Sequence, residues 1–245
     1  MINITLIGTG NVALQLKEVF EKTDGIQVNR IISGRGDFIS KIKLKKAKSD
    51  IYIIAISDDA ISSVSQKLKD SEKLIVHTSG SVSMNALPEG NRRGVFYPLQ
   101  TFSKNRKIDF QSVPICIETE DKNDLVLLEK LARLVSSSVY EINSEQRKSL
   151  HLAAVFVNNF TNHMYHIGNE LCDTENIPFE ILKPLITETA LKVNSLTPFD
   201  AQTGPARRED KKTIAKQIAQ LAVSNHKKIY QAITNSILNA HGKEL

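Results

Sequence analysis

Residues 2–13 read INITLIGTGNVA: a short run of β-forming residues, two glycines separated by one residue, and the start of a helical pattern. The apolar residues Val12, Leu16 and Phe20 continue that pattern and predict a helix over residues 11–22. A strand, a tight turn and a helix in this order are typical of the first unit of an α/β fold with a parallel sheet.

The glycine-rich turn has the spacing of a dinucleotide-binding fingerprint. Gly8 permits the sharp turn, Gly10 lets the backbone approach a pyrophosphate, and Ala13 takes the place of a third glycine. The start of the next helix offers free N–H groups and a partial positive charge. A purely structural turn is the alternative, but a second strand about twenty residues on favours the nucleotide. The residues expected to contact it are Gly8, Thr9, Gly10, Asn11 and Val12.

Strand-like and helical segments alternate up to about residue 143. Further strands are expected over residues 26–33, 50–56, 74–77, 94–97, 113–118 and 139–142, with helices over 60–68 and 123–135. This alternation predicts an α/β fold with a doubly wound Rossmann-type parallel sheet and right-handed crossovers. Only helical patterns follow, over residues 145–172, 179–193 and 211–239. We therefore expect a Rossmann domain over 1–143 and an all-helical domain over 144–245.

The end of the second expected strand indicates which dinucleotide is bound. NAD-specific proteins usually place an acidic residue there, whereas this chain has Ser33, Gly34 and Arg35. The Arg35 guanidinium can pair with a ribose 2′-phosphate. Asp37 opposes this reading, and an ordinary surface arginine is the alternative. We expect the cofactor to be NADP, with Ser33 and Arg35 among the residues that bind it.

Polar segments follow three of the expected strands, at the edge where doubly wound folds bind ligands. They begin near Ser57, His77 and Tyr97 and combine small residues, hydroxyls and turn formers. We expect Ser57 and His77 to contact the cofactor, and Ser79 and Gln100 to contact the substrate. Each segment is also compatible with ordinary turn chemistry.

Polar residues interrupt the long helical pattern over 145–172 at helical spacing. The stripe consists of Lys148, His151, Val155, Asn159, Asn162 and His166. A hydrogen-bonded structural role is the better explanation for any one of them, but beside a dinucleotide site the stripe favours catalysis. His151 titrates near neutrality, Lys148 does so when desolvated, and Asn159 can orient a substrate. These three are the expected catalytic residues.

A polar loop over residues 203–210 interrupts the helical part of the chain. Arg208 is able to bind a substrate carboxylate through two parallel hydrogen bonds. The alternative is that the loop only begins the next helix, with Asp210 near its positive end. Spacing alone does not separate these readings.

The composition, with 41% apolar and 24% charged residues, is that of a globular protein. Cys116 and Cys172 lie far apart and outside any CxxC motif, so neither a disulfide framework nor a metal site is expected. We find no apolar stretch near the roughly 18 residues of a membrane helix, and no leader. A cytoplasmic location without a membrane partner is therefore expected. The five lysines between positions 41 and 48 have no interleaved aromatics, so no nucleic acid is expected either.

With these segments in view, the sequence resembles a family of bacterial NADP oxidoreductases that join a Rossmann-like domain to a helical C-terminal domain of unassigned function. The resemblance covers almost the whole chain. It is carried by GTGNVA at 8–13, SDDAI at 57–61, HTSG at 77–80, PLQTF at 98–102, HLAAVF at 151–156 with Asn159, and TGP at 203–205 with Arg208 and Asp210. The family is similar in design to pyrroline-5-carboxylate reductases, deazaflavin-dependent NADP reductases, and 6-phosphogluconate and β-hydroxyacid dehydrogenases.

This kinship implies a catalytic site between the domains and a helical domain that forms a homodimer. It also implies a lysine and an asparagine on the interdomain helix, although Lys148 and Asn159 are more widely spaced than in the hydroxyacid branch. Tyr97 stands where the family commonly has histidine, and Glu209 where it commonly has glycine.

The sequence thus predicts an enzyme that transfers a hydride between NADP(H) and a small carbonyl, hydroxy or imine compound bearing a carboxylate. A non-catalytic NADP sensor is the alternative from another class. A deazaflavin-linked reductase differs from the first hypothesis only in its second substrate.

Overall fold

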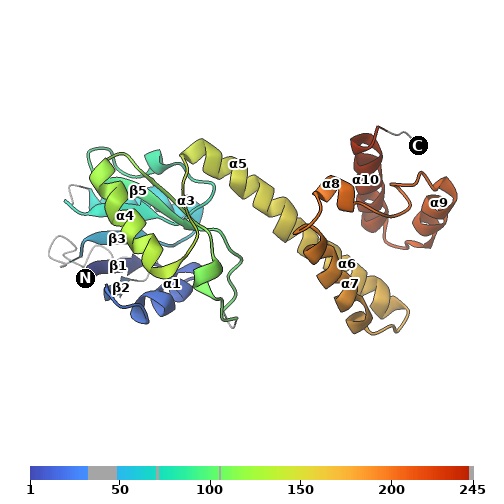
Figure 1. Cartoon of the computed structure of the whole chain (residues 1–245), viewed down its shortest axis with the longest axis horizontal. Helices are drawn as coiled ribbons and strands as arrows, with labels where there is room; N and C mark the ends of the chain where they lie inside the picture. The colour runs from blue at the N-terminus through green and yellow to red at the C-terminus, as the bar shows by residue number, and fades with distance from the viewer. Residues whose placement is uncertain (33–48, 70–71, 105, 243–245) are drawn as a thin grey trace. The chain divides into compact units, whose positions relative to one another are not determined.

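The computed structural model describes residues 1–32, 49–69, 72–104 and 106–242. By its internal contacts the chain divides into two compact units, Met1–Asn159 and Phe160–Leu245 (Figure 1). The first holds a sheet covered by helices, and the second contains helices only among its described residues. The predicted fold class, a Rossmann-type α/β domain followed by a helical domain, is confirmed.

The predicted boundary at residue 143 marks a change in secondary structure. The last strand, β7, covers Val139–Glu141, and α5 covers Ser144–Ala154. The units defined by contacts divide later, at Asn159, because α5 packs against the sheet.

A seven-stranded sheet forms the centre of the first unit, in the order β2-β1-β3-β4-β5-β6-β7. The strands are β1 (Ile2–Ile7), β2 (Ile26–Ile32), β3 (Ile51–Ile54), β4 (Leu74–His77), β5 (Arg93–Pro98), β6 (Ile115–Thr119) and β7. β1 to β5 run parallel, whereas β6 is antiparallel to β5, which the prediction of parallel crossovers missed. Between these two strands the described residues form only the short 3₁₀ turn Phe110–Ser112, so no crossover helix returns the chain to a parallel start.

The order of the strands creates a switch point at β1. β2 pairs with one side of β1 and β3 with the other, so the chain changes its direction of winding there. Ligands of doubly wound sheets bind outside the carboxyl ends of the strands at such a point. The fold therefore directs attention to the ends of β1 and β3.

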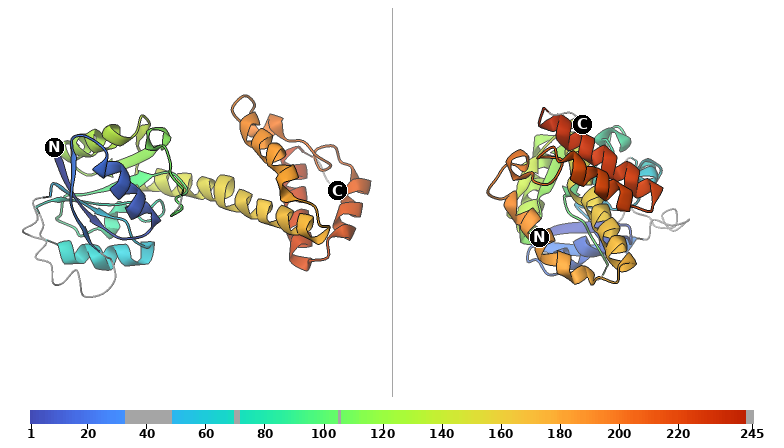
Figure 2. Two further views of the ribbon diagram at one scale, coloured as in Figure 1. Left: turned by 90° about the horizontal axis from the view of Figure 1, so that it is seen from below. Right: turned by 90° about the vertical axis from the view of Figure 1, so that its right-hand side faces the viewer.

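Helices cover both faces of the sheet (Figure 2). α1 (Asn11–Glu21) and α4 (Lys122–Val135) pack on one face, and α3 (Asp58–Ser65) packs on the other. Leu6 and Ile7 of β1 are both fully buried, one in each layer. Burying an aliphatic side chain in this way contributes about 1.5–3 kcal/mol.

The second unit is built from α6 (Thr161–Thr174), α7 (Lys183–Lys192), α8 (Pro198–Ala201), α9 (Lys211–Gln220) and α10 (Ser224–Ala240). The single helix predicted over 211–239 is broken between Gln220 and Ser224. No residue of α6 or α7 is buried. Among the described residues, no helix has both the length and the apolar character needed to cross a bilayer.

A π-helical turn, Val155–Phe160, joins α5 to α6 and contains the division between the units. We predicted one regular helix over 145–172. A π turn holds one residue more than an α turn, which shifts the phase of the side chains. The polar stripe predicted at regular α-helical spacing therefore does not continue past Val155.

Candidate functional site

The two glycines of the first turn have different surroundings. Gly8 has φ +138°, and a Cβ there would lie 2.0 Å from the carbonyl oxygen of Ala55. Only glycine fits between β1 and the end of β3. Gly10 has φ −77°, and a Cβ there would meet no atom of the described residues within 4 Å. The backbone at Gly10 therefore borders open space.

The amino end of α1 is not capped by any side chain of the described residues. Gly10 is the N-cap residue, and the first turn of α1 contains no acidic residue. In contrast, α4 is capped by Asp121, and α5 is capped by a reciprocal pair of side-chain bonds between Asn143 and Gln146. The N–H groups and partial positive charge of α1 are thus left for an anion.

A cavity of about 540 Å³ opens at this position. Its volume lies in the range of roughly 300–1,000 Å³ that small-molecule sites occupy. The predicted site residues that line it are Thr9, Gly10, Asn11, Val12, Ser57 and Gln100. The residues that line it but were not predicted are Ala55, Ile56, Ala60, Thr78 and Phe102. Each of these lies within three residues of a predicted residue, so proximity in sequence was the signal that could have found them.

The wall formed by Phe102 is held against α1 by side-chain amides. Asn11 Nδ2 donates to the Phe102 carbonyl oxygen at 3.0 Å. One turn further along α1, Gln15 Nε2 donates to the carbonyl oxygens of Ser103 at 3.4 Å and Arg106 at 3.2 Å. The amide nitrogen of Asn11 therefore fixes the wall, and its carbonyl oxygen is the part left for a ligand.

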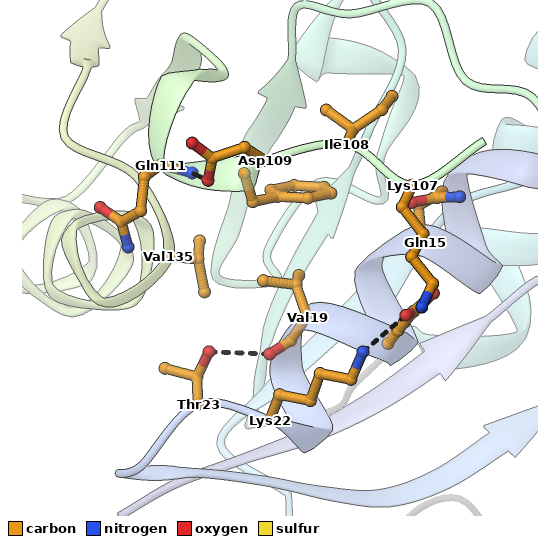
Figure 3. A pocket seen from close by; sticks show the side chains of 11 residues that line it. Gln15, Val19, Lys22, Thr23, Lys107, Ile108, Asp109, Gln111 and Val135 are labelled. Carbon is orange, nitrogen blue, oxygen red and sulfur yellow. Dashed lines mark hydrogen bonds and ion pairs between the residues drawn. The ribbon is translucent and has the colours of Figure 1, made fainter.

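A second cavity, of about 190 Å³, lies along the carboxyl-terminal half of α1 (Figure 3). Polar groups at its edge are already paired: Lys22 Nζ lies 2.6 Å from Glu18 Oε1, and the Thr23 hydroxyl donates to the Val19 carbonyl oxygen at 2.7 Å. This cavity contains none of the predicted site residues.

His77 was predicted to contact the cofactor, but it is fully buried at the end of β4 and does not line the larger cavity. Its Nδ1 accepts the backbone N–H of Ser79 at 3.2 Å. Burial, assisted by the positive charge of Arg147 and opposed by Ser83 and Asp58, lowers the pKa of His77 to about 4. His77 is therefore neutral near pH 7 and shapes the loop that follows β4.

Sequence reasoning missed Arg147, whose side chain is fully buried. Its Nε donates to the Ser79 carbonyl oxygen at 3.2 Å, and one terminal nitrogen donates to the Val82 carbonyl oxygen at 2.6 Å. The other terminal nitrogen pairs with Glu118 of β6. Arg147 thereby ties α5 to the loop after β4 and to the sheet. It lies four residues before His151, and that helical spacing was the available signal.

His151 and Tyr97 meet over the same loop. The Tyr97 hydroxyl lies 3.0 Å from His151 Nδ1, and the two rings pack edge to face with centroids 6.0 Å apart. A Cβ on Gly80 would lie 2.5 Å from His151 Nδ1, so glycine is required there. Burial raises the pKa of Tyr97 to about 12. Three separate segments that the sequence singled out are thus in contact.

Ser79 was predicted to contact the substrate. In the structure its hydroxyl forms hydrogen bonds within the loop after β4. It accepts the backbone N–H groups of Ser81 at 3.2 Å and Val82 at 3.0 Å. The Ser81 hydroxyl in turn donates to the Asp58 carboxylate at the start of α3. These bonds connect the loop after β4 to the loop after β3.

Among the described residues, no hydrogen bond links Lys148 or Asn159 to His151. Lys148 is exposed, and its Nζ lies 2.7 Å from Glu145 Oε1. Within the first unit Lys148 is therefore not desolvated, and its catalytic role stays a prediction. Asn159 is exposed at the last position of the first unit.

Arg208 belongs to the second unit and is exposed. The neighbouring Asp210 caps α9 by accepting the backbone N–H of Thr213 at 3.0 Å, which lowers the pKa of its carboxyl group. Glu209 between them adopts φ +57°, a left-handed conformation that favours glycine.

Several sequence-based predictions fall on residues that the structure does not describe. Ser33 and Arg35, and the five lysines between positions 41 and 48, lie outside the described residues. Within the described part of the chain, no group of three or more His, Cys, Asp or Glu side chains is placed to hold a metal ion.

Two comparisons with known proteins bear on this arrangement. The model of DUF2520, a domain of unknown function, matches residues 113–237, about half of the chain. A solved structure, the "putative NADP oxidoreductase" from Bacteroides fragilis, is 38% identical, covers 96% of this chain and 97% of its own, and has a TM-score of 0.85. The chain belongs to the DUF2520 family. The predicted resemblance to a family that joins a Rossmann-like domain to a helical domain is thus confirmed.

More distant structures share the fold of this DUF2520 chain. Protein TM1727 from Thermotoga maritima has a TM-score of 0.72 at 20% identity, with 96% of each chain covered. A pyrroline-5-carboxylate reductase from Coxiella burnetii has a TM-score of 0.53 at 17% identity, covering 100% of this chain and 99% of its own. No curated protein sequence matches the chain.

Proposed function

We propose that this DUF2520 chain is an NADP-dependent oxidoreductase that transfers a hydride between NADP(H) and a small carbonyl, hydroxy or imine compound bearing a carboxylate. The observation that carries the proposal is the cavity of about 540 Å³ at the ends of β1 and β3, bordered by Gly10 and the uncapped start of α1. A relative with 38% identity over nearly the whole chain bears the name of such an enzyme, which supports the same assignment.

The residues around the cavity fit a dinucleotide. The backbone at Gly10 and the first N–H groups of α1 suit a pyrophosphate, because a dipole end and a close approach are both available. Ser57 and Thr78 also line the cavity, and their hydroxyls suit ribose hydroxyls. When bound, the nicotinamide ring supplies or accepts the hydride. The preference for NADP rests on Arg35, whose guanidinium can pair with a ribose 2′-phosphate.

His151 is the proposed catalytic residue, since it is the half-buried titratable side chain beside the loop after β4. It contacts Gly80, two residues after Thr78 of the cavity wall. Gln100 in that wall is proposed to orient the substrate. Asn159 and Arg208 keep the roles proposed for them from the sequence, Asn159 to orient the substrate and Arg208 to bind its carboxylate.

Substitution of Gly10 tests the binding site directly. Gly10→Val should fold normally, because φ is ordinary and a Cβ meets no neighbour, but the new side chain should obstruct the pyrophosphate. Thermal unfolding with and without NADPH measures this, because a ligand of the folded state raises its stability. Gly168→Val in α6 is the matched control. An undiminished NADPH shift in Gly10→Val would refute the site.

The choice of cofactor and the presence of catalysis need separate tests. Wild-type protein should be stabilised more by NADPH than by NADH, and Arg35→Gln should remove that difference; a larger NADH effect would contradict the NADP assignment. A panel of keto, imino and hydroxy acids followed by NADPH absorbance tests turnover. His151→Gln should lower kcat about 10²- to 10⁴-fold. Intact NADPH binding without turnover anywhere would favour the sensor.

We also propose that the second unit forms a homodimer. α6 and α7 bury none of their residues within the chain. Apolar side chains remain exposed along this region, namely Leu171, Ile181, Leu185, Leu191, Val193 and Phe199. A surface of this kind normally marks an interaction site. A second copy of the same chain would offer a matching apolar face.

A further inference from the structure

The hydroxyl of Tyr97 faces a single partner. Tyr97 lies on β5 and is only 8% exposed, and its hydroxyl oxygen lies 3.0 Å from His151 Nδ1. Among the described residues neither group forms another side-chain hydrogen bond. The imidazole of His151 is half-buried on α5, and its other nitrogen, Nε2, forms no hydrogen bond with the described residues.

The direction of this hydrogen bond follows from burial. A buried hydroxyl hydrogen without an acceptor costs about 1–3 kcal/mol. If Nδ1 carried the ring hydrogen and donated to the oxygen, the hydroxyl hydrogen of Tyr97 would be left without an acceptor in the described structure. If Tyr97 donates to Nδ1, the hydroxyl hydrogen has an acceptor and Nδ1 has a donor. Because burial raises the pKa of Tyr97 to about 12, the hydroxyl keeps its hydrogen.

The two carboxylates near the Tyr97–His151 pair already have other partners. The charged and titratable groups packed near it are Arg147 of α5, His77 of β4, Cys116 and Glu118 of β6, and Asp58 of α3. Glu118 is paired with Arg147, and Asp58 accepts from Ser81. Gly80 closes the remaining side, since a Cβ there would lie 2.8 Å from Tyr97 Cζ as well as 2.5 Å from His151 Nδ1.

We propose that Tyr97 is a positioning residue that donates to His151 Nδ1 and holds the neutral imidazole as the tautomer with its hydrogen on Nε2. The side chain of His151 then presents a hydrogen-bond donor. The substrate atom placed at Nε2 must therefore be an acceptor, such as a carbonyl oxygen, an imine nitrogen or a carboxylate oxygen. Neutral imidazole in this role polarises the bond that receives the hydride. The role at the substrate rests on the proposed function, whereas the tautomer is a property of the free protein.

Nitrogen NMR of ¹⁵N-histidine-labelled protein tests the tautomer without any substrate. The ring of His151 is identified by the signals lost in His151→Gln. At about pH 8, where an ordinary imidazole is neutral, wild-type Nδ1 should show the shift of a non-protonated nitrogen and Nε2 that of a protonated one. In Tyr97→Phe the two signals should move toward each other as the tautomers mix. Tyr140→Phe, which removes an exposed hydroxyl from β7, should leave them unchanged.

A protonated Nδ1 in the wild type, or His151 signals identical in wild type and Tyr97→Phe, would overturn the proposal. Circular dichroism of Tyr97→Phe shows whether the variant is folded, and the wild-type spectrum alone decides the tautomer if it is not. The outcome is separable from the proposed function. Full turnover in His151→Gln would remove the catalytic role of His151 and leave the tautomer assignment standing.

Discussion

The sheet of the first unit and the helices α6 and α7 of the second differ in how they place their apolar residues. The first unit buries isoleucines and leucines on both faces of its sheet, whereas α6 and α7 of the second unit bury none of their residues. A unit that completes its own core can hold a defined cavity without help. Elsewhere the second unit does bury apolar residues, such as Ile214 and Leu238, so the exposed side chains on α6 and α7 are the ones that a partner would cover. Substitutions in the first unit should therefore change unfolding, and those on α6 and α7 should change association.

The largest expected effect is in the first unit, at Arg147. Arg147→Met should reduce the free energy of unfolding by about 3–5 kcal/mol, because it leaves the carboxylate of Glu118 poorly solvated and without its partner. Urea denaturation followed by circular dichroism measures the loss. Arg133→Met breaks the exposed pair with Glu129 and should cost less than about 1 kcal/mol. Equal losses in both variants would contradict the larger contribution expected of the buried Arg147–Glu118 pair.

The next effect is a dependence of stability on pH. The folded pKa of His77 is about 4, against 6.5 for an ordinary histidine, so the unfolded chain binds a proton that folded His77 rejects. Neutral His77 makes its full contribution to the free energy of unfolding above pH 6.5. This contribution falls by up to about 3 kcal/mol as the pH drops toward 4. Denaturation at several pH values should show a shallower acid loss in His77→Gln than in wild type. Parallel profiles would contradict this.

On the second unit, Leu185 of α7 offers a test of association. Leu185 is 63% exposed, so Leu185→Asp should leave the fold intact and raise the dimer Kd at least about tenfold. Size-exclusion chromatography with light scattering measures the mass. Val126→Asp on α4 is matched in exposure, at 65%, and should not alter it. A monomeric wild type would end the dimer proposal.

The smallest effect concerns backbone strain. Glu209→Gly should stabilise the protein by about 1 kcal/mol, because φ +57° is unfavourable for a residue with a Cβ. Asn176 has φ +54°, but asparagine tolerates this region, so Asn176→Gly should change stability less. Thermal unfolding compares the two. A destabilised Glu209→Gly would mean that contacts of the Glu209 side chain outweigh the strain.

The parts of this molecule that could be predicted from sequence are those set by neighbouring residues. The turn at Gly8 and Gly10, and strands such as Leu74–His77, depend on local periodicity and turn chemistry. Six predicted residues converge on the cavity because the ends of parallel strands meet at one edge of a sheet.

The remaining features depend on contacts between distant segments. Arg147 pairs with Glu118, and Tyr97 meets His151, across separations that periodicity does not encode. The reversed direction of β6 and the π-helical turn at Val155 also leave no local pattern. Lys148 was predicted and Arg147 was not, and one sequence does not show which of two adjacent cations faces inward.

Gly10 has a consequence beyond the site itself. The described chain around Gly10 would accept a larger residue, since the backbone is ordinary and no described atom lies within 4 Å of a Cβ there. A glycine in such a place forgoes about 0.4–1 kcal/mol, because the unfolded chain gains freedom that another residue would remove. Gly8 is dictated by the polypeptide alone, through the carbonyl of Ala55. No contact within the described residues dictates glycine at position 10, so the proposed pyrophosphate gives this position a reason that the fold does not.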